Sequence, residues 1–226
     1  MPAKPAVIVF DVIETLFSLI PIETRLREAG MPAGSLREVF AALLRDAFAL
    51  DAAGTPKPFA DIARATLEVA LTTQGIAGVD EKIESIMAGF AELPAHDDVR
   101  PAFEAVRDAG IRMITLTNGG AENTRKLLNR AGLAEFVERS VAVAEANHWK
   151  PRAEVYRHAA TTCGVEPGRM AMVAAHAWDL HGAKQVGFMT GWVQRQDKHY
   201  LGVMAPPDVT ARSLPEVVHQ LLGRAP

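Results

Sequence analysis

The sequence predicts an α/β protein: a doubly wound parallel sheet with a helical domain inserted near its start. Three observations predict this fold class. The run Ala6–Phe10 is apolar and largely β-branched, which is typical of a strand buried on both faces of a parallel sheet. Residues 17–94 carry helical patterns and no strand-like run. From Asp98 onward, strand-like and helix-like segments alternate, which indicates parallel strands joined by crossover helices.

The composition is that of an ordinary globular protein. The 226 residues are 49% hydrophobic and 23% charged, enough for one large domain or for a core with a smaller insert. A net charge of −3 gives no reason to expect nucleic acid or an anionic membrane as partner. The single cysteine, Cys163, excludes an internal disulfide and a cysteine-rich metal site. The sequence has no signal-peptide pattern and no apolar run of transmembrane length, so we expect a cytoplasmic protein.

Three amphipathic helices are predicted in the insert. Ser35 and Glu38 have the spacing of a capping box, and apolar residues follow at helical spacing as far as Phe48. Two further helices are predicted over residues 59–73 and 81–90. The predicted boundaries are therefore 17–94 for the helical domain, and 1–16 with 95–226 for the α/β core.

The alternating region supplies the remaining elements of the core. Strands are predicted over residues 111–116, 140–144, 170–174 and 188–193. Helices are predicted over residues 101–109, 123–131, 152–163, 178–186 and 214–222. Glycine follows most of these helices, as expected at helix ends.

Asp11 follows the first strand directly, where open α/β sheets place their ligands. An Asp there can be a nucleophile, a metal ligand or a general base, or it can simply cap the following turn. The segment Phe10-Asp11-x-x-x-Thr15-Leu16 resembles the first motif of the haloacid dehalogenase superfamily, in which the Asp is the attacking nucleophile. The resemblance implies a Rossmann-like core with the insert as a helical cap, and it makes Asp11 and Thr15 catalytic residues.

Ile13 is the position at which the chain departs from the phosphatases of that superfamily, which carry a second Asp there. That Asp protonates a leaving alkoxide, which is a strong base and needs a positioned acid. A halide ion is a very weak base and needs no proton. The pattern is therefore closest to that of the L-2-haloacid dehalogenases, with Ile13 beside the substrate.

Two further segments follow predicted strands. Thr117 and Asn118, before two glycines, suit anion binding by side-chain and backbone donors, although a plain strand–helix turn gives the same pattern. The resemblance implies that Thr117 holds the substrate carboxylate and that Asn118 helps to receive the halide. It makes Lys150 the cation that keeps the nucleophile ionised, where the alternative is a solvated surface lysine. It gives Tyr156 a role at the substrate, where the alternative is a half-buried helix residue.

The segment Ala174-Ala175-His176-Ala177-Trp178-Asp179 completes the pattern. In the dehalogenases it reads Ser-Ser-Asn-Ala-Trp-Asp, so the Ser and Asn positions have become Ala174 and His176. The resemblance makes Asp179 catalytic. We expect His176 to position or deprotonate the hydrolytic water with Asp179; the alternative is a buried, satisfied histidine. Arg45 follows Leu43-Leu44, much as the halide-binding arginine of the dehalogenases follows Leu-Trp, although an arginine on an amphipathic helix is usually a surface residue.

The expected reaction is hydrolytic removal of halide from a short 2-halo acid through an ester on Asp11. No organic cofactor and no resident metal are expected; Mg²⁺ is conceivable between Asp11 and Asp179 but not required. The cluster His96-Asp97-Asp98 is read as a solvated turn rather than a metal site. The partner is the small substrate alone, and the family resemblance implies a homodimer. Two alternatives remain open: a phosphatase using Glu14 or His176 as its acid, and a non-catalytic relative.

Overall fold

The structure is a computed structural model that describes residues 4–223. These residues divide into two compact units, which we call the core and the cap. The core contains the described residues up to Phe17 and those from Ala95 onward, and the cap is Ser18–Pro94. The first division falls one residue later than the predicted boundary. The ends of the predicted core domain, residues 1–3 and 224–226, lie outside the described residues.

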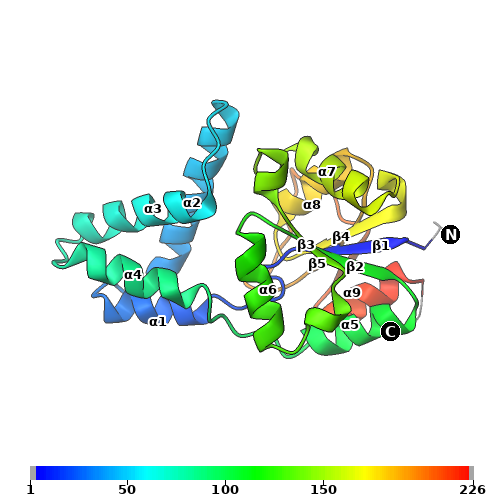
Figure 1. Ribbon diagram of the computed structural model, residues 1–226, viewed down its shortest axis with the longest axis horizontal. Coiled ribbons are helices and arrows are strands. Elements are labelled where there is room, and N and C mark those ends of the chain that lie inside the picture. Colours follow the sequence, from blue (N-terminus) through cyan, green and yellow to red (C-terminus); the bar gives the residue numbers. More distant parts are fainter. Residues whose placement is uncertain (1–3, 224–226) are drawn as a thin grey trace. The chain divides into compact units, whose positions relative to one another are not determined.

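A parallel six-stranded sheet forms the centre of the core (Figure 1). Its strand order is β3-β2-β1-β4-β5-β6, and all neighbouring strands run parallel. The strands are β1 (Val7–Phe10), β2 (Arg112–Thr117), β3 (Arg139–Ala142), β4 (Met170–Ala174), β5 (Met189–Val193) and β6 (Val209–Ala211). The chain winds outward from β1 through β2 and β3, then returns to the other side of β1 with β4. The predicted doubly wound sheet is confirmed, and its switch point lies between β1 and β4.

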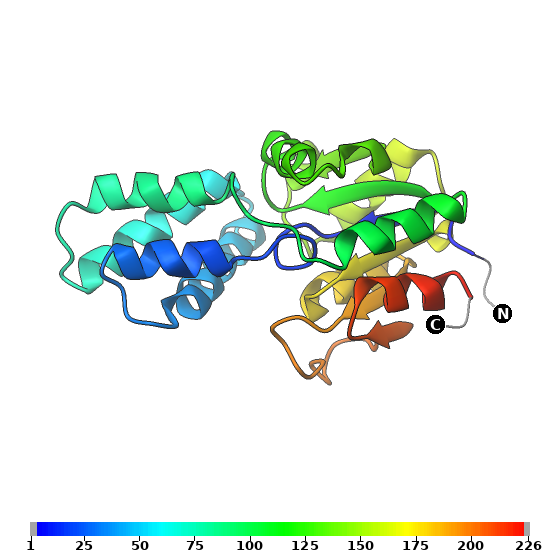
Figure 2. The same ribbon diagram turned by 90° about the horizontal axis from the view of Figure 1, so that it is seen from below.

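Helices cover both faces of this sheet (Figures 1 and 2). They are α5 (Val99–Asp108), α6 (Ala121–Arg130), α7 (Ala153–Cys163), α8 (Ala177–Gln185) and α9 (Leu214–Leu221). Helices α7 and α8 pack on one face over a fully buried cluster that includes Val9, Leu116 and Met172 of the sheet and Tyr156 of α7. Helices α5 and α9 lie against each other on the opposite face. All residues of β1 and β4 are buried, which explains why the sequence shows these strands as unbroken apolar runs.

The regular elements of the cap, residues 18–94, are all helices. Its helices are α1 (Ile20–Glu28), α2 (Ser35–Ala52), α3 (Phe59–Thr73) and α4 (Val79–Gly89). Helix α3 has the predicted bounds, and α2 extends its predicted pattern to Ala52. Helix α4 begins two residues earlier and ends one residue earlier than predicted, and α1 was not predicted. Buried apolar side chains at helical spacing, such as Val39, Leu43 and Ala47 of α2, form the interior of this unit.

The predicted capping box at Ser35 is wrong. Ser35 is the first helical residue, and its hydroxyl donates to the Pro32 carbonyl oxygen (2.7 Å) instead of accepting a backbone hydrogen bond. The orphan N–H groups at the start of α2 are satisfied from another helix, because the Glu23 carboxylate of α1 accepts hydrogen bonds from Gly34 N (2.6 Å) and Leu36 N (3.0 Å). A tertiary contact therefore replaces the local cap.

The sequence analysis also missed β6, a three-residue edge strand. It has one buried side chain, Ala211, and follows a loop with two prolines, so no apolar alternation marks it. At β3 the strand ends at Ala142, and Val143 begins a short 3₁₀ helix where the prediction continued the strand.

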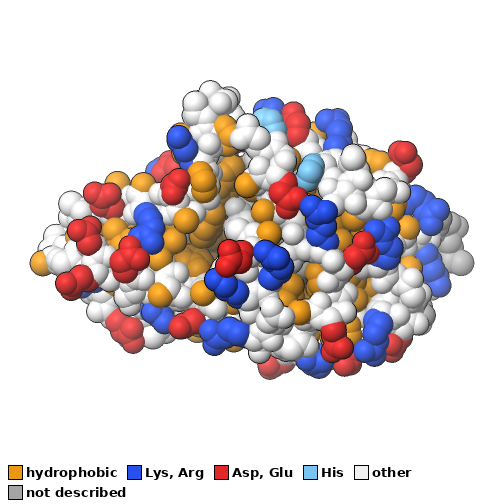
Figure 3. Space-filling view, viewed as in Figure 1, with side chains coloured by type: hydrophobic (Ala, Val, Ile, Leu, Met, Phe, Trp, Pro, Cys, Tyr) orange, Lys and Arg blue, Asp and Glu red, His pale blue; other side chains and the backbone are white. Residues whose placement is uncertain are grey.

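Within residues 4–223, none of the helices combines the length and the apolar character that crossing a membrane requires. Acidic and basic side chains are interspersed over the face shown in Figure 3, without a large patch of one sign. Acidic and basic residues, which are nearly equal in number in the composition, are thus also mixed on this face.

Candidate active site

Asp11 lies at the carboxyl end of β1, beside the switch point of the sheet. Its backbone N–H donates to Val173 O of β4 (3.0 Å), and its side chain is 7% exposed. The Thr15 hydroxyl donates to Asp11 Oδ2 (2.6 Å) and accepts a hydrogen bond from Ala175 N (2.9 Å). The predicted catalytic pair is therefore in contact, and Thr15 joins the loop after β1 to the loop after β4. In the loop after Asp11, Val12 is buried and Ile13 is partly exposed.

Lys150 contacts Asp11 from the protein interior and has no exposed surface. Its ammonium group donates to Asp11 Oδ1 (2.8 Å), to Asp179 Oδ2 (2.6 Å) and to the Leu116 carbonyl oxygen (2.9 Å). Burial alone would lower the pKa of Lys150, but the two carboxylates outweigh it and raise that pKa. Lys150 is therefore a buried cation that bridges two carboxylates, and the alternative of a solvated surface lysine is wrong.

Asp179 and Tyr156 are also completely buried. The Tyr156 hydroxyl donates to Asp179 Oδ1 (2.7 Å), so the two oxygens of this carboxylate are divided between Tyr156 and Lys150. Burial raises the pKa of Asp179, an effect that the Lys150 ammonium opposes, and burial also raises the pKa of Tyr156 well above its usual value. Asp179 thus holds Lys150, and Tyr156 holds Asp179; the alternative of a half-buried Tyr156 is wrong.

His176 joins Asp11 to Glu14. Its Nδ1 lies 3.3 Å from Asp11 Oδ2, and its Nε2 lies 3.0 Å from Glu14 Oε2. The ring stacks on Trp178, with centroids 5.1 Å apart. Burial alone would lower the pKa of His176, but the hydrogen bonds to Asp11 and Glu14 and their charges raise it to about 10. The imidazole is therefore a cation at neutral pH while Asp11 is ionised.

Asp11 itself is held ionised. Burial alone would raise the pKa of Asp11, but the charge of Lys150 and the hydrogen bond and charge of His176 outweigh it and lower that pKa well below its usual range. An ionised carboxylate held by two cations is ready to act as a nucleophile without first losing a proton.

Thr117 and Asn118 lie at the carboxyl end of β2, next to the start of α6. The Thr117 hydroxyl accepts a hydrogen bond from Gly119 N (2.9 Å), and Asn118 Oδ1 accepts one from the Lys150 backbone N–H (3.0 Å). Asn118 therefore connects this loop to the segment that carries Lys150. The anion-binding roles predicted for both residues stay predictions.

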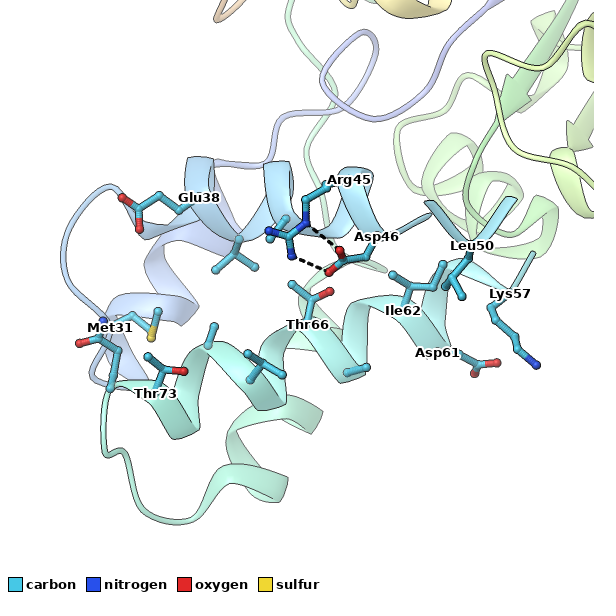
Figure 4. A pocket seen from close by; sticks show the side chains of 16 residues that line it. Met31, Glu38, Arg45, Asp46, Leu50, Lys57, Asp61, Ile62, Thr66 and Thr73 are labelled. Atoms are coloured by element: carbon cyan, nitrogen blue, oxygen red, sulfur yellow. Dashed lines mark hydrogen bonds and ion pairs between the residues drawn. The ribbon is translucent and has the colours of Figure 1, made fainter. Parts of the chain in front are cut away.

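Arg45 lies on α2 of the cap. Its side chain is 72% exposed and forms an ion pair with Asp46 (2.7 Å). Both residues line a cavity of about 730 Å³ between α2 and α3, which is shown in Figure 4. The halide role predicted for Arg45 stays a prediction.

Two features of this site were missed from the sequence. Glu14 was considered only as a phosphatase acid, yet its carboxylate is the partner of His176. The reading of His96–Asp98 as a solvated turn is wrong for its first and last residues. His96 contacts Glu14, and Asp98 forms a partly buried ion pair with Arg195 (2.7 Å). Among residues 4–223, no cluster of three or more His, Cys, Asp or Glu side chains is arranged to hold a metal ion.

Comparison with known proteins identifies similar sequences and folds. The sequence model of the family described as haloacid dehalogenase-like hydrolase matches residues 5–187. (S)-2-haloacid dehalogenase 1 from Pseudomonas sp. (strain CBS-3) is 30% identical over 156 residues, 69% of each chain. Haloacetate dehalogenase H-2 from Moraxella sp. (strain B) is 26% identical over 130 residues, 58% of each chain.

Among solved structures, the L-2-haloacid dehalogenase from Xanthobacter autotrophicus with covalently bound chloropropionic acid has the same fold. Its TM-score is 0.87 at 18% identity, covering 98% of this chain and 100% of that one.

Proposed function

The chain belongs to the haloacid dehalogenase-like hydrolases, and on that premise we propose that it hydrolyses the carbon–halogen bond of short 2-halo acids. The observation that carries the proposal is the state of Asp11. It is a buried, ionised carboxylate between Lys150 and His176, and the residue two positions along the chain is the apolar Ile13. This arrangement provides a nucleophile and lacks the second Asp that would protonate a strongly basic leaving group.

In the first step, an oxygen of Asp11 attacks C2 of the substrate from the side opposite the halogen. The new bond joins that oxygen to C2, and the carbon–halogen electron pair leaves with the halide. The product is a neutral ester on Asp11 with inverted configuration at C2. Thr117, Asn118 and the N–H groups at the start of α6 would hold the substrate carboxylate and the halide, with Arg45 of the cap as a further halide ligand.

In the second step, His176 supplies the base. Ester formation removes the negative charge of Asp11, which is one of the causes of the raised His176 pKa. Ester formation therefore lowers the pKa of His176, and in the proposed step the imidazolium then gives the proton on Nδ1 to solvent. Neutral His176, hydrogen-bonded to Glu14, then takes a proton from water as that water attacks the Asp11 carbonyl carbon.

Collapse of the resulting tetrahedral species breaks the bond between the Asp11 carbonyl carbon and the substrate oxygen. The proton of the added hydroxyl passes to that oxygen, which releases the 2-hydroxy acid and returns the Asp11 carboxylate beside a protonated His176. The cycle releases one halide and one proton. The expectation that Asp179 binds this water changes, because Asp179 has no exposed surface and both its oxygens are occupied.

We also propose that the reaction needs no Mg²⁺. The Lys150 ammonium already occupies the position between Asp11 and Asp179 where a cation would neutralise both carboxylates. We further propose that the enzyme is cytoplasmic and that it forms a homodimer. Sedimentation in solution would test the dimer.

One observation favours a second candidate, a phosphatase. His176 is a cation 3.3 Å from the nucleophile, so it can protonate a leaving alkoxide in place of the missing second Asp. That reaction would depend on Mg²⁺ to screen the phosphate dianion.

The test is halide release from fluoroacetate, chloroacetate and both enantiomers of 2-chloropropionate, with and without EDTA, and with Asp11→Asn as control. EDTA-insensitive release that disappears in Asp11→Asn is the expected result. The absence of release from every substrate, together with Mg²⁺-dependent hydrolysis of a phosphate ester, would favour the phosphatase. No turnover in either assay would indicate a non-catalytic relative.

A further inference from the structure

The turn that follows Asp11 has an unusual backbone. Glu14 has a φ of +64°, in the left-handed region that residues other than glycine rarely adopt. Inside the turn, Glu14 N donates to Phe17 O (2.8 Å), while Leu16 N (2.9 Å) and Phe17 N (3.1 Å) donate to Val12 O. This conformation lets Glu14 reach His176 and Thr15 reach Asp11, so it sets the geometry of two contacts at the nucleophile.

Two side chains from distant parts of the core hold the outward carbonyl groups of this turn. His96 Nε2 lies 3.1 Å from Glu14 O, and Arg195 Nη2 donates to the neighbouring Thr15 O (3.0 Å). The His96 backbone N–H also donates to Leu16 O (2.9 Å). Burial and the charge of Arg195 lower the pKa of His96, so its ring is neutral, and the carbonyl partner requires the proton on Nε2.

Arg195 is itself held in place. Its guanidinium forms two hydrogen bonds with the Asp98 carboxylate (2.7 and 3.0 Å), and its side chain is 12% exposed. Asp98 also accepts a hydrogen bond from Leu214 N at the start of α9 (3.0 Å). A planar guanidinium bound on both sides by fixed groups loses little further freedom when it holds Thr15 O.

We infer that His96 and Arg195 are positioning residues that hold the Glu14–Thr15 backbone, and thereby aim the Glu14 carboxylate at His176. We call these two residues the brace. Both contact the backbone of the turn and act on the site through it. The kinetic consequence rests on the proposed function, because it assigns ester hydrolysis to His176 and Glu14.

The brace should affect the two steps of the reaction unequally. Asp11 keeps its hydrogen bonds to Lys150 and to Val173 O without the brace, so ester formation depends on it weakly. Glu14 has no such second support for its direction, because its left-handed backbone conformation is what points the side chain toward His176. Loss of the brace therefore slows ester hydrolysis most.

The experiment compares His96→Leu and Arg195→Met with the conservative variants His96→Gln and Arg195→Lys, which keep a donor. Arg107→Gln, which removes an exposed ion pair with Asp108, is the matched control. With 2-chloropropionate, the apolar variants should lower kcat between about ten- and a hundredfold and lower KM in parallel, with kcat/KM within about twofold of the wild type, because kcat/KM depends only on the steps up to ester formation. The ester on Asp11 should accumulate in the mass spectrum of the protein, and the conservative variants should recover part of the loss.

Two readouts do not depend on activity. The apolar variants should lower the pKa of His176, measured by NMR of ¹⁵N-histidine-labelled protein, because Glu14 no longer faces the ring. They should also speed amide hydrogen exchange across residues 12–17. Glu14→Gln should produce the same change in the His176 titration while leaving exchange slow.

A His176 titration and an exchange pattern that match the wild type in both apolar variants would overturn the inference, even if these variants melt earlier. If the wild-type protein releases no halide, the proposed function fails, and the titration and exchange results still decide whether the brace holds the turn.

Discussion

Replacing Lys150 by Met tests whether this buried ammonium is what allows two carboxylates to lie inside the core. Lys150 has no exposed surface and lies 2.8 Å from Asp11 and 2.6 Å from Asp179. Breaking a buried ion pair by removing one partner costs about 3–5 kcal/mol, because a charge is left buried and uncompensated. At about 2–4 °C per kcal/mol for a chain of this size, Lys150→Met should lower Tm by roughly 6–20 °C.

Loss of the Lys150 charge should leave Asp179 less well compensated than Asp11. Asp11 keeps His176 and Thr15, whereas Lys150 is the one cation among residues 4–223 that lies within ion-pair distance of Asp179. Replacing Asp179 by Asn should therefore destabilise the wild type but stabilise Lys150→Met. Thermal and urea unfolding of the wild type, both single variants and the double variant measure this reversal of sign as a double-mutant cycle.

Lys184→Met is the matched control, since it removes a partly exposed pair with Asp208 and should cost at most about 1 kcal/mol. An Asp179→Asn effect of the same sign and size in both backgrounds would refute the argument. So would a loss in Lys150→Met no greater than that of the control.

Two further predictions concern stability. His176 has a pKa of about 10 in the folded protein against a usual 6.5, so its stabilising effect is complete below about pH 6.5 and is lost as the pH rises toward 10. Urea unfolding should show the free energy of unfolding falling over that window and a flatter profile in His176→Gln; equal slopes would contradict this. A Cβ on Gly182 would lie 2.6 Å from the Pro151 carbonyl oxygen, so Gly182→Ala should cost about 1–3 kcal/mol in thermal unfolding. Gly168→Ala, with nothing within 4 Å of its added Cβ, should stay within about 0.5 kcal/mol of the wild type, and equal losses would refute the packing argument.

Local pattern was enough to predict most of the fold. The strand β4 and the helix α3 have the predicted bounds, because each buries a face that leaves its own period in the sequence. The family resemblance placed Asp11, Lys150 and Asp179 in one site. In the folded core, Lys150 contacts both carboxylates. The alternation of strands and helices, the inserted helical domain and the family can thus be predicted from the sequence alone.

The failures share one cause. At Ser35 a carboxylate from α1 replaces the local cap, and at β6 an edge strand of three residues leaves no pattern. In both cases the stabilising partner lies elsewhere in the chain.

The same reason separates what the sequence determined from what the tertiary structure decided at the site. The resemblance of the strand-end residues to the motifs of the family identified the proposed nucleophile, its lysine and the missing acid at Ile13. The pairing of His176 with Glu14 spans 162 positions, and the contact of Arg195 with Thr15 spans 180. Such contacts follow only from the strand order that places β4 beside β1 and from the left-handed turn at Glu14. The pairing of His176, the proposed base, with Glu14 is therefore set by packing across the sheet, which no local pattern records.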